Sequence, residues 1–175
     1  MNRGLKRGQT PCTRGLTPLW LASALLALIP AASLPAAVTL STDVRPVVFG
    51  VMRLDEEQVL AQFGSYHNEI TCSSTNGQAW YLKVQALQPL TSGADVIPLE
   101  AFAWELIQST GRGSVAHPNA FTPFSLMPDL AYLSGPDEGD GAPVQLRFRY
   151  RLRIPARQTS GIYHTTIRFT FTELY

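Results

Sequence analysis

The stretch QLRFRYRLRI (residues 145–154) alternates arginines with apolar residues without a break. One set of alternate positions holds Leu146, Phe148, Tyr150, Leu152 and Ile154, and the other holds Arg147, Arg149, Arg151 and Arg153. Successive side chains of a β-strand point to opposite faces of its sheet. The stretch therefore predicts a strand with one face on a core and the other in water, which is typical of antiparallel sheets.

Most other apolar stretches show the same period of two. The clearest are AWYLKVQAL (79–87), AFAWELI (101–107) and IYHTTIRFTF (162–171), and the less regular ones are VTLSTDVRPVVF (38–49) and FTPFSLM (121–127). Turn-forming residues separate them, including the hairpin signal Asn76-Gly77. About seven short strands with this spacing predict an all-β, antiparallel β-sandwich. We expect IYHTTIRFTF to be a central strand or an assembly strand.

One segment departs from this pattern. LDEEQVLAQFG (54–64) offers Asp55 as a helix N-cap, Gln58 three positions later and Gly64 as a stop. These are helix signals. A short helix and a pair of bent strands both fit the segment, and neither changes the fold class.

The first 37 residues have the composition of a secretory signal peptide. Arg3, Lys6, Arg7 and Arg14 form a basic head. An uncharged apolar run follows at residues 19–29, and then small residues and prolines, PAASLPAA (30–37). This order predicts cleavage between Ser33 and Val38, with an uncleaved N-terminal anchor as the alternative. We expect a domain of residues 38–175 that is secreted, periplasmic or on the cell surface, with no transmembrane segment in the mature chain.

Charge and cysteine content limit the function of the mature part. The chain has 14 Lys and Arg and 13 Asp and Glu, and four of the basic residues lie in the leader, so the mature part has 10 basic and 13 acidic residues and a net charge of −3. This balance counts against nucleic-acid binding. Because Cys12 lies in the leader, Cys72 is alone in the mature chain and can form no internal disulfide. We interpret it as a buried, inert thiol rather than a nucleophile.

A search for catalytic or metal-binding motifs gives no candidate. His67, His117 and His164 lie far apart in the sequence, and there is no nucleophile elbow or phosphate-binding glycine loop. The acidic stretch GPDEGDGAP (135–143) lacks the spacing of a calcium loop. We therefore predict no enzyme activity, metal or cofactor. Trp80 and Trp104 are expected in the core, with an exposed sugar-binding platform as the alternative.

Two stretches resemble known families of exported bacterial proteins. NGQAWYLKVQA (76–86) resembles the Trp-x-Leu strand of WxL-type cell-surface domains, with Trp80 and Leu82 at the motif positions. PARQTSGIYHTTIRFTF (155–171) resembles the closing strand of spore-coat-U-like and pilin-like proteins, through Gln158, Gly161 and Tyr163. The resemblance implies an exported, immunoglobulin-like sandwich that serves as a surface or fimbrial component.

The chain departs from the WxL pattern at one place, and Gly161 and Tyr163 also have a physical interpretation that needs no family. Phe169 and Phe171 replace the second Trp-x-Leu of WxL domains, so peptidoglycan binding of that kind is not predicted. Independently of any family, Tyr163 at the start of a strand can return its hydroxyl to the backbone and fix a corner of the sandwich. Gly161 would permit the close approach before it.

Three functional hypotheses follow from the sequence. The first is a structural or interaction protein of the bacterial envelope or cell surface, such as a pilin-like subunit that joins other subunits by strand addition through VTLSTDVRPVVF. The alternative is an extracellular carbohydrate- or polyanion-binding module that contacts cell-envelope polysaccharide through the arginine row. We favour the arginines as the wet face of a strand, paired with acids on neighbouring strands. A secreted enzyme built from distant residues is the third, weakest hypothesis.

Overall fold

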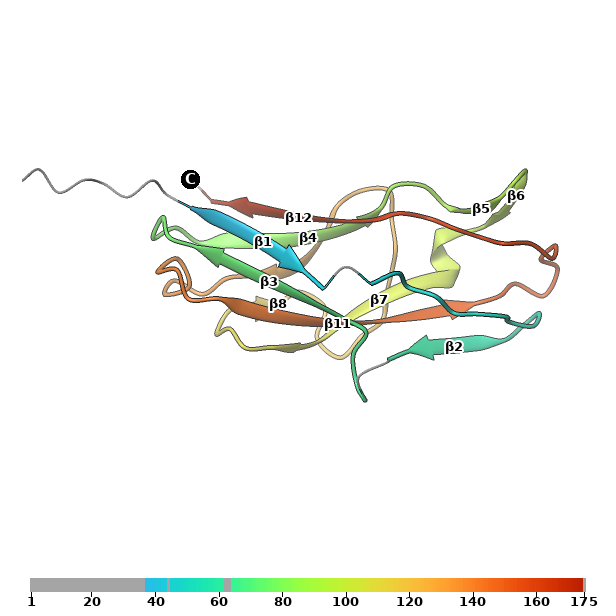
Figure 1. The fold of residues 1–175 in the computed structure, drawn as a ribbon, viewed down its shortest axis with the longest axis horizontal. Coiled ribbons are helices and arrows are strands. Elements are labelled where there is room, and N and C mark those ends of the chain that lie inside the picture. The colour runs from blue at the N-terminus through green and yellow to red at the C-terminus, as the bar shows by residue number, and fades with distance from the viewer. Residues whose placement is uncertain (1–36, 44, 62–63, 175) are drawn as a thin grey trace, which may run out of the picture. The chain divides into compact units, whose positions relative to one another are not determined.

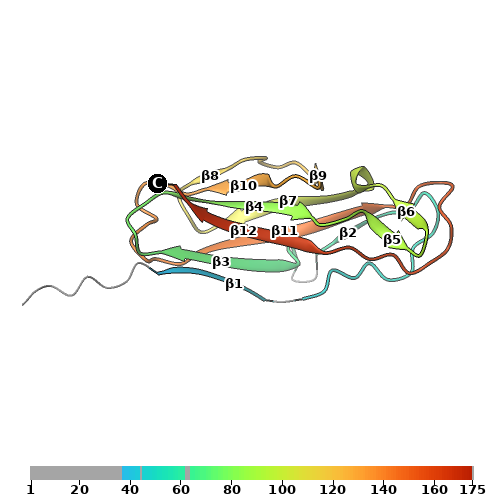
Figure 2. The ribbon, with the colours of Figure 1, turned by 90° about the horizontal axis from the view of Figure 1, so that it is seen from above.

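Two antiparallel sheets make up most of the structure (Figures 1 and 2), a computed structural model that describes residues 37–43, 45–61 and 64–174. The strands are β1 (Val38–Thr42), β2 (Glu57–Leu60), β3 (Asn68–Ser74), β4 (Trp80–Ala86), β5 (Leu90–Ser92), β6 (Asp95–Ile97), β7 (Phe102–Ser109), β8 (Ser114–Val115), β9 (Thr122–Pro123), β10 (Asp129–Leu133), β11 (Val144–Arg153) and β12 (Ile167–Glu173). A 3-10 turn, η1 (Leu99–Ala101), precedes β7. The all-β, antiparallel prediction is confirmed.

The strand order places β11 inside the larger sheet. That sheet runs β1-β3-β11-β7-β9, with β2 also paired to β11, and the smaller sheet runs β12-β4-β10-β8. β5 and β6 form a separate hairpin. The four strands of two or three residues have no periodic apolar run, which is why the sequence predicts about seven strands and the described residues form twelve.

The side-chain alternation of β11 agrees with the sequence. Its apolar residues from Val144 to Leu152 are buried, and Arg147, Arg149 and Arg151 between them are partly exposed. One edge of β11 pairs with β7 along most of its length. The other edge pairs first with β3, from Val144 to Phe148, and then with β2, from Tyr150 to Arg153. The arginine face therefore lies on the outside of an internal strand.

One hydrophobic core lies between the two sheets. Trp80 and Trp104 are among its largest fully buried side chains, which confirms the core interpretation and rules out both rings as exposed sugar platforms. Phe148 of β11 meets Phe169 of β12 edge to face, with ring centroids 5.2 Å apart. This contact joins the two sheets.

The helix alternative for residues 54–64 is wrong. Residues 57–60 form β2, and Asp55 takes a positive φ of 62° in the turn before it. The Asp55 N–H donates to Ile154 O at 3.0 Å, and the Ile154 N–H donates to Glu56 O at 2.8 Å. Because β3 leaves β11 at Phe148, the second half of β11 has a free edge, and pairing with it overrides the local helix preference. Residues 62 and 63 lie outside the described part of the chain.

The C-terminal strand is shorter than predicted and lies at an edge. β12 begins at Ile167 rather than Ile162, and among the described strands it pairs with β4 alone. The prediction of a central strand is therefore wrong. Between residues 162 and 166 the chain makes one isolated bridge, His164 to Thr91. The role of this segment in assembly stays a prediction.

The predicted leader, residues 1–37, lies outside the described residues apart from Ala37. The part of the expected cleavage region that precedes Ala37 is also outside them. Within the part that is described, no helix combines the length and the apolar character needed to cross a bilayer.

Cys72 should be unreactive in the folded protein. It is fully buried in β3, and burial raises the pKa of its thiol to about 12. We expect the native protein without residues 1–37 to react with Ellman's reagent at pH 8 at least about a thousandfold more slowly than the unfolded protein. A Ser160→Cys variant, with an exposed thiol, is the positive control. Rapid native labelling of Cys72 would contradict this burial.

Candidate functional site: a groove at the open edge

An open groove of about 1290 Å³ lies at one end of the core, between two segments outside the sheets. One wall is residues 45–54, which link β1 to the turn before β2 and which we call the strap (Figure 1). The other wall is residues 158–166, which lead into β12 and which we call the arm. We call the space between them the edge groove.

The floor of the edge groove is apolar. It is formed by the side of the core that the strap and the arm leave open, with Ile97, Phe102, Tyr150, Leu152 and Phe169 among its lining residues. Aspartate and glutamate are absent from the described residues that line the groove. Such a surface favours an apolar partner, because burying an apolar side chain is worth about 25 cal/mol per Å² removed from water.

The strap has an irregular backbone without sheet partners. Residues 47–52 form no hydrogen bond with any residue that the structure describes. Val47, Phe49 and Met52 pack against the core, and the Phe49 ring meets Phe102 edge to face at 6.0 Å. An unpaired backbone beside an apolar floor is a site where another strand can add.

Polar contacts hold the start of the strap. The His67 side chain is buried, and its Nε2 lies 3.2 Å from Pro46 O. Asn68 donates from Nδ2 to Asp43 O at 3.2 Å and to Arg45 O at 3.4 Å. Burial lowers the pKa of His67, although its hydrogen bond to Pro46 and the charge of Asp43 act in the opposite direction. The imidazole is therefore neutral at pH 7.

The arm has an internal brace at Tyr163. The Tyr163 hydroxyl donates to Thr159 O at 2.7 Å and accepts from Gln158 Nε2 at 2.7 Å. A Cβ at Gly161 would collide with the Ser92 hydroxyl, so any other residue there would require the Ser92 side chain to turn away. Tyr163 and Gly161 thus set the path of one groove wall. Ile162 between them projects into solvent and is 87% exposed.

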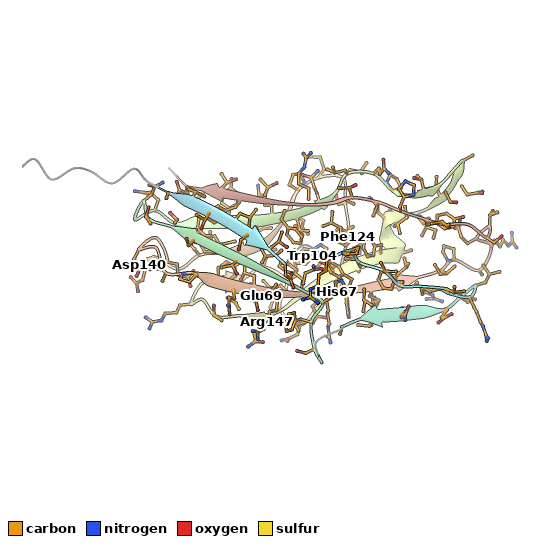
Figure 3. All side chains as sticks on the ribbon, in the orientation of Figure 1. His67, Glu69, Trp104, Phe124, Asp140 and Arg147 are labelled. Atoms are coloured by element: carbon orange, nitrogen blue, oxygen red, sulfur yellow. The ribbon has the colours of Figure 1, made fainter. Side chains whose placement is uncertain are left out.

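The arginine row lies away from the groove, on the outer face of the larger sheet. Each arginine faces a carboxylate: Arg147 Nε and Glu69 Oε2 at 2.8 Å (Figure 3), Arg149 Nη2 and Glu105 Oε2 at 2.7 Å, Arg151 Nη1 and Glu57 Oε1 at 3.9 Å, and Arg153 Nη2 and Asp55 Oδ1 at 3.4 Å. Aromatic rings cover part of the row, since Arg149 and Arg151 both lie over Phe121. Because four carboxylates offset the four positive charges, a polyanion would have to displace them, and we do not propose this row as its site.

The other sequence candidates have structural positions. Trp80 and Leu82 are fully buried in β4, and the Trp80 indole N–H donates to Glu138 O at 2.9 Å. His117 and Asp129 approach to 3.3 Å, but among the described residues no three His, Cys, Asp or Glu side chains are placed to hold a metal. Neither pair adds a chemical site to the groove.

Sequence reasoning missed the strap as a groove wall. The stretch VTLSTDVRPVVF (38–49) predicted one irregular strand, whereas β1 ends at Thr42, and Pro46 and Gly50 were the available signals that the chain then leaves the sheet. Gly50 has a φ of 74°, which only glycine adopts readily.

Comparison with known proteins adds no assignment. No family model matches the chain, and no curated protein matches it. The candidate site therefore rests on the geometry of the edge groove.

The ion pairs of the arginine row should differ in their contribution to stability. The Glu105 side chain is only 6% exposed, so Arg149→Gln leaves a nearly buried carboxylate without its charged partner. We expect a loss of about 1.5–3 kcal/mol in the free energy of unfolding. Arg153→Gln is the matched control, because both members of its pair are 63% exposed, and it should cost about 0–1 kcal/mol. Urea denaturation measures both variants, and equal losses would contradict the proposed role of Glu105 burial.

Proposed function

We propose that this chain is an exported structural or interaction subunit of the bacterial envelope or cell surface, with an immunoglobulin-like, pilin-like fold. In this proposal the edge groove takes an extended segment of a partner chain by strand addition. The observation that carries the proposal is the apolar groove between the strap and the arm, whose walls lie outside the sheets. A strand placed there can bury alternate side chains on the floor and pair its main chain at the edges.

Exposed apolar side chains along the groove support this proposal. Val48, Val51, Leu54 and Ile162 line the groove and are exposed large hydrophobic residues, and Val51 is 100% exposed. Exposed apolar side chains that line one groove are typical of interaction sites. The partner would cover residues that the subunit alone leaves in water.

The N-terminal strand has the properties of a segment that can be exchanged between copies. All five residues of β1 are exposed, and Val38 and Leu40 remain 45% and 42% exposed although they are apolar. Among the described strands β1 pairs with β3 alone, and the side-chain hydrogen bond between Thr39 and Ser73 of β3 lies at the surface. Leaving β3 would therefore cost main-chain hydrogen bonds and little core burial.

Deletion of Val38–Thr42 tests the exchange of this strand. Because none of the five residues belongs to the core, we expect a folded protein whose midpoint falls by only a few degrees, at about 2–4 °C per kcal/mol. The deletion should abolish self-association in sedimentation experiments. Unfolding of the deleted form would mean that β1 belongs to the core of its own subunit.

A second experiment tests the groove itself. Fluorescein-labelled peptide VTLSTDV (residues 38–44) should bind the wild-type protein at pH 7.5, as measured by anisotropy. Val51→Asp with Ile162→Asp should weaken binding at least about tenfold, because both charges would stand at the mouth of an apolar groove. Leu126→Asp with Met127→Asp, in an exposed loop elsewhere, is the matched control. Equal binding by the two double variants would refute the groove as the peptide site.

A further inference from the structure

The strap is fixed at its two ends and unpaired in its middle. At the far end the Arg53 N–H donates to Glu56 Oε2 at 2.6 Å, and the Glu56 N–H donates to Arg53 O at 3.2 Å. At the near end the contacts come from His67 and Asn68, which lie where β3 begins (Figure 3). A segment with few backbone hydrogen bonds opens at a lower free-energy cost than a paired strand.

We propose that His67 is a proton-operated latch: protonation of its imidazole releases the near end of the strap from the core and widens the edge groove. The meaning of this widening rests on the function proposed above, in which the groove receives a strand. The release of the strap itself is a property of the free protein.

The geometry of His67 accounts for the direction of the effect. Pro46 O can only accept a hydrogen bond, so Nε2 holds the proton of the neutral ring and Nδ1 is bare. Nδ1 is buried and has no hydrogen-bond partner among the described residues. A second proton would place a donor and a positive charge in a buried position without an acceptor. That state favours the open strap, where water solvates the ring.

The groups that face His67 do not reverse this preference. The Tyr150 ring of β11 lies edge to face at 5.8 Å, and burial raises the pKa of Tyr150, so it stays neutral. From the strap side, Asp43 raises the pKa of His67 and Arg45 lowers it. Farther along its own strand, Glu69 is paired with Arg147. Desolvation is the largest effect on His67, and it lowers the pKa.

Asn68 makes the closed latch easier to open. Its Oδ1 is also buried without a hydrogen-bond partner in the described part of the chain. Opening the strap lets water reach this oxygen and the bare nitrogen of His67, which offsets part of the hydrogen bonds lost to Asp43, Arg45 and Pro46.

The pH window follows from the direction of the shift. The closed state has a His67 pKa below 6.5, and the open state has the ordinary value near 6.5. The closed state is therefore fully favoured above pH 6.5. As the pH falls below this value, the opening equilibrium rises by up to about tenfold per pH unit until the closed-state pKa is reached.

Methionine methyl groups provide the test. The chain contains Met1, Met52 and Met127; Met52 packs against the core from the strap, and Met127 is 74% exposed. In protein labelled with 13C-methyl methionine, the Met52 signal should move toward its solvent-exposed position between pH 7.5 and 5, together with titration of the His67 ring. Met127 should not move. A Met52 signal that stays constant over this range would overturn the latch.

Variants separate His67 from the other histidines. The Met52 change should disappear in His67→Gln and persist in His117→Gln and His164→Gln. Persistence in His67→Gln would overturn the assignment. Should His67→Gln fail to fold, the wild-type titrations decide, because the His67 ring and the Met52 methyl must change with one shared midpoint below 6.5.

The proposal for His67 and the proposal for the groove can be rejected independently of each other. Peptide VTLSTDV binding at pH 7.5 tests the groove, and Met52 reports the strap without any peptide. A Met52 change with no peptide binding supports the latch and rejects strand addition. Peptide binding with a constant Met52 signal supports the groove and rejects the latch. When both hold, peptide affinity should rise as the pH falls from 6.5, by up to about tenfold per pH unit.

Discussion

The rest of the structure depends on the alternation of β11. Its apolar face contributes Leu146, Phe148 and Tyr150 to the core, and each is at most 1% exposed. Burying side chains of this size contributes about 1.5–3 kcal/mol each, whereas a partly exposed ion pair contributes about 0–1 kcal/mol. The core face therefore fixes the register of β11, because a slip of one residue would bring arginines inside. The acids opposite the arginines then neutralise its outer face.

The edge groove is a consequence of how β11 is paired. β3 covers only the first half of its edge, and β2 returns to cover the second half. The chain between β1 and β2 must therefore pass over the open side of the core instead of joining a sheet. It covers that side with Val47, Phe49 and Met52 but leaves its own backbone unpaired. The arm approaches from the other sheet, where His164 bridges to Thr91, and the groove is the space between the strap and the arm.

An unpaired edge beside an apolar floor is an aggregation hazard for an isolated subunit and a binding site for a specific partner. The outer face of the larger sheet and the edge groove differ in charge and in exposed apolar residues. The outer face of the larger sheet has an arginine and a carboxylate at each step, so it offers little to a partner. The groove has uncharged walls over most of its length and the most exposed apolar residues. In the proposed function, strand addition uses the second surface, and a proton at His67 would control access to it.

The sequence by itself determined the β class, the inward faces of β4, β7 and β11 and the outward direction of the arginines, because period-two alternation is a local property that each strand carries alone. It also placed Trp80, Leu82 and Cys72 in the core. Only the tertiary structure decided that residues 57–60 form a strand, since the helix signals there are local and the free edge of β11 that overrides them comes from residues 90 positions later. The groove could not be predicted from the sequence either. One of its walls is backbone that lacks a strand partner, and the pairing of distant segments leaves no periodic signal in the sequence.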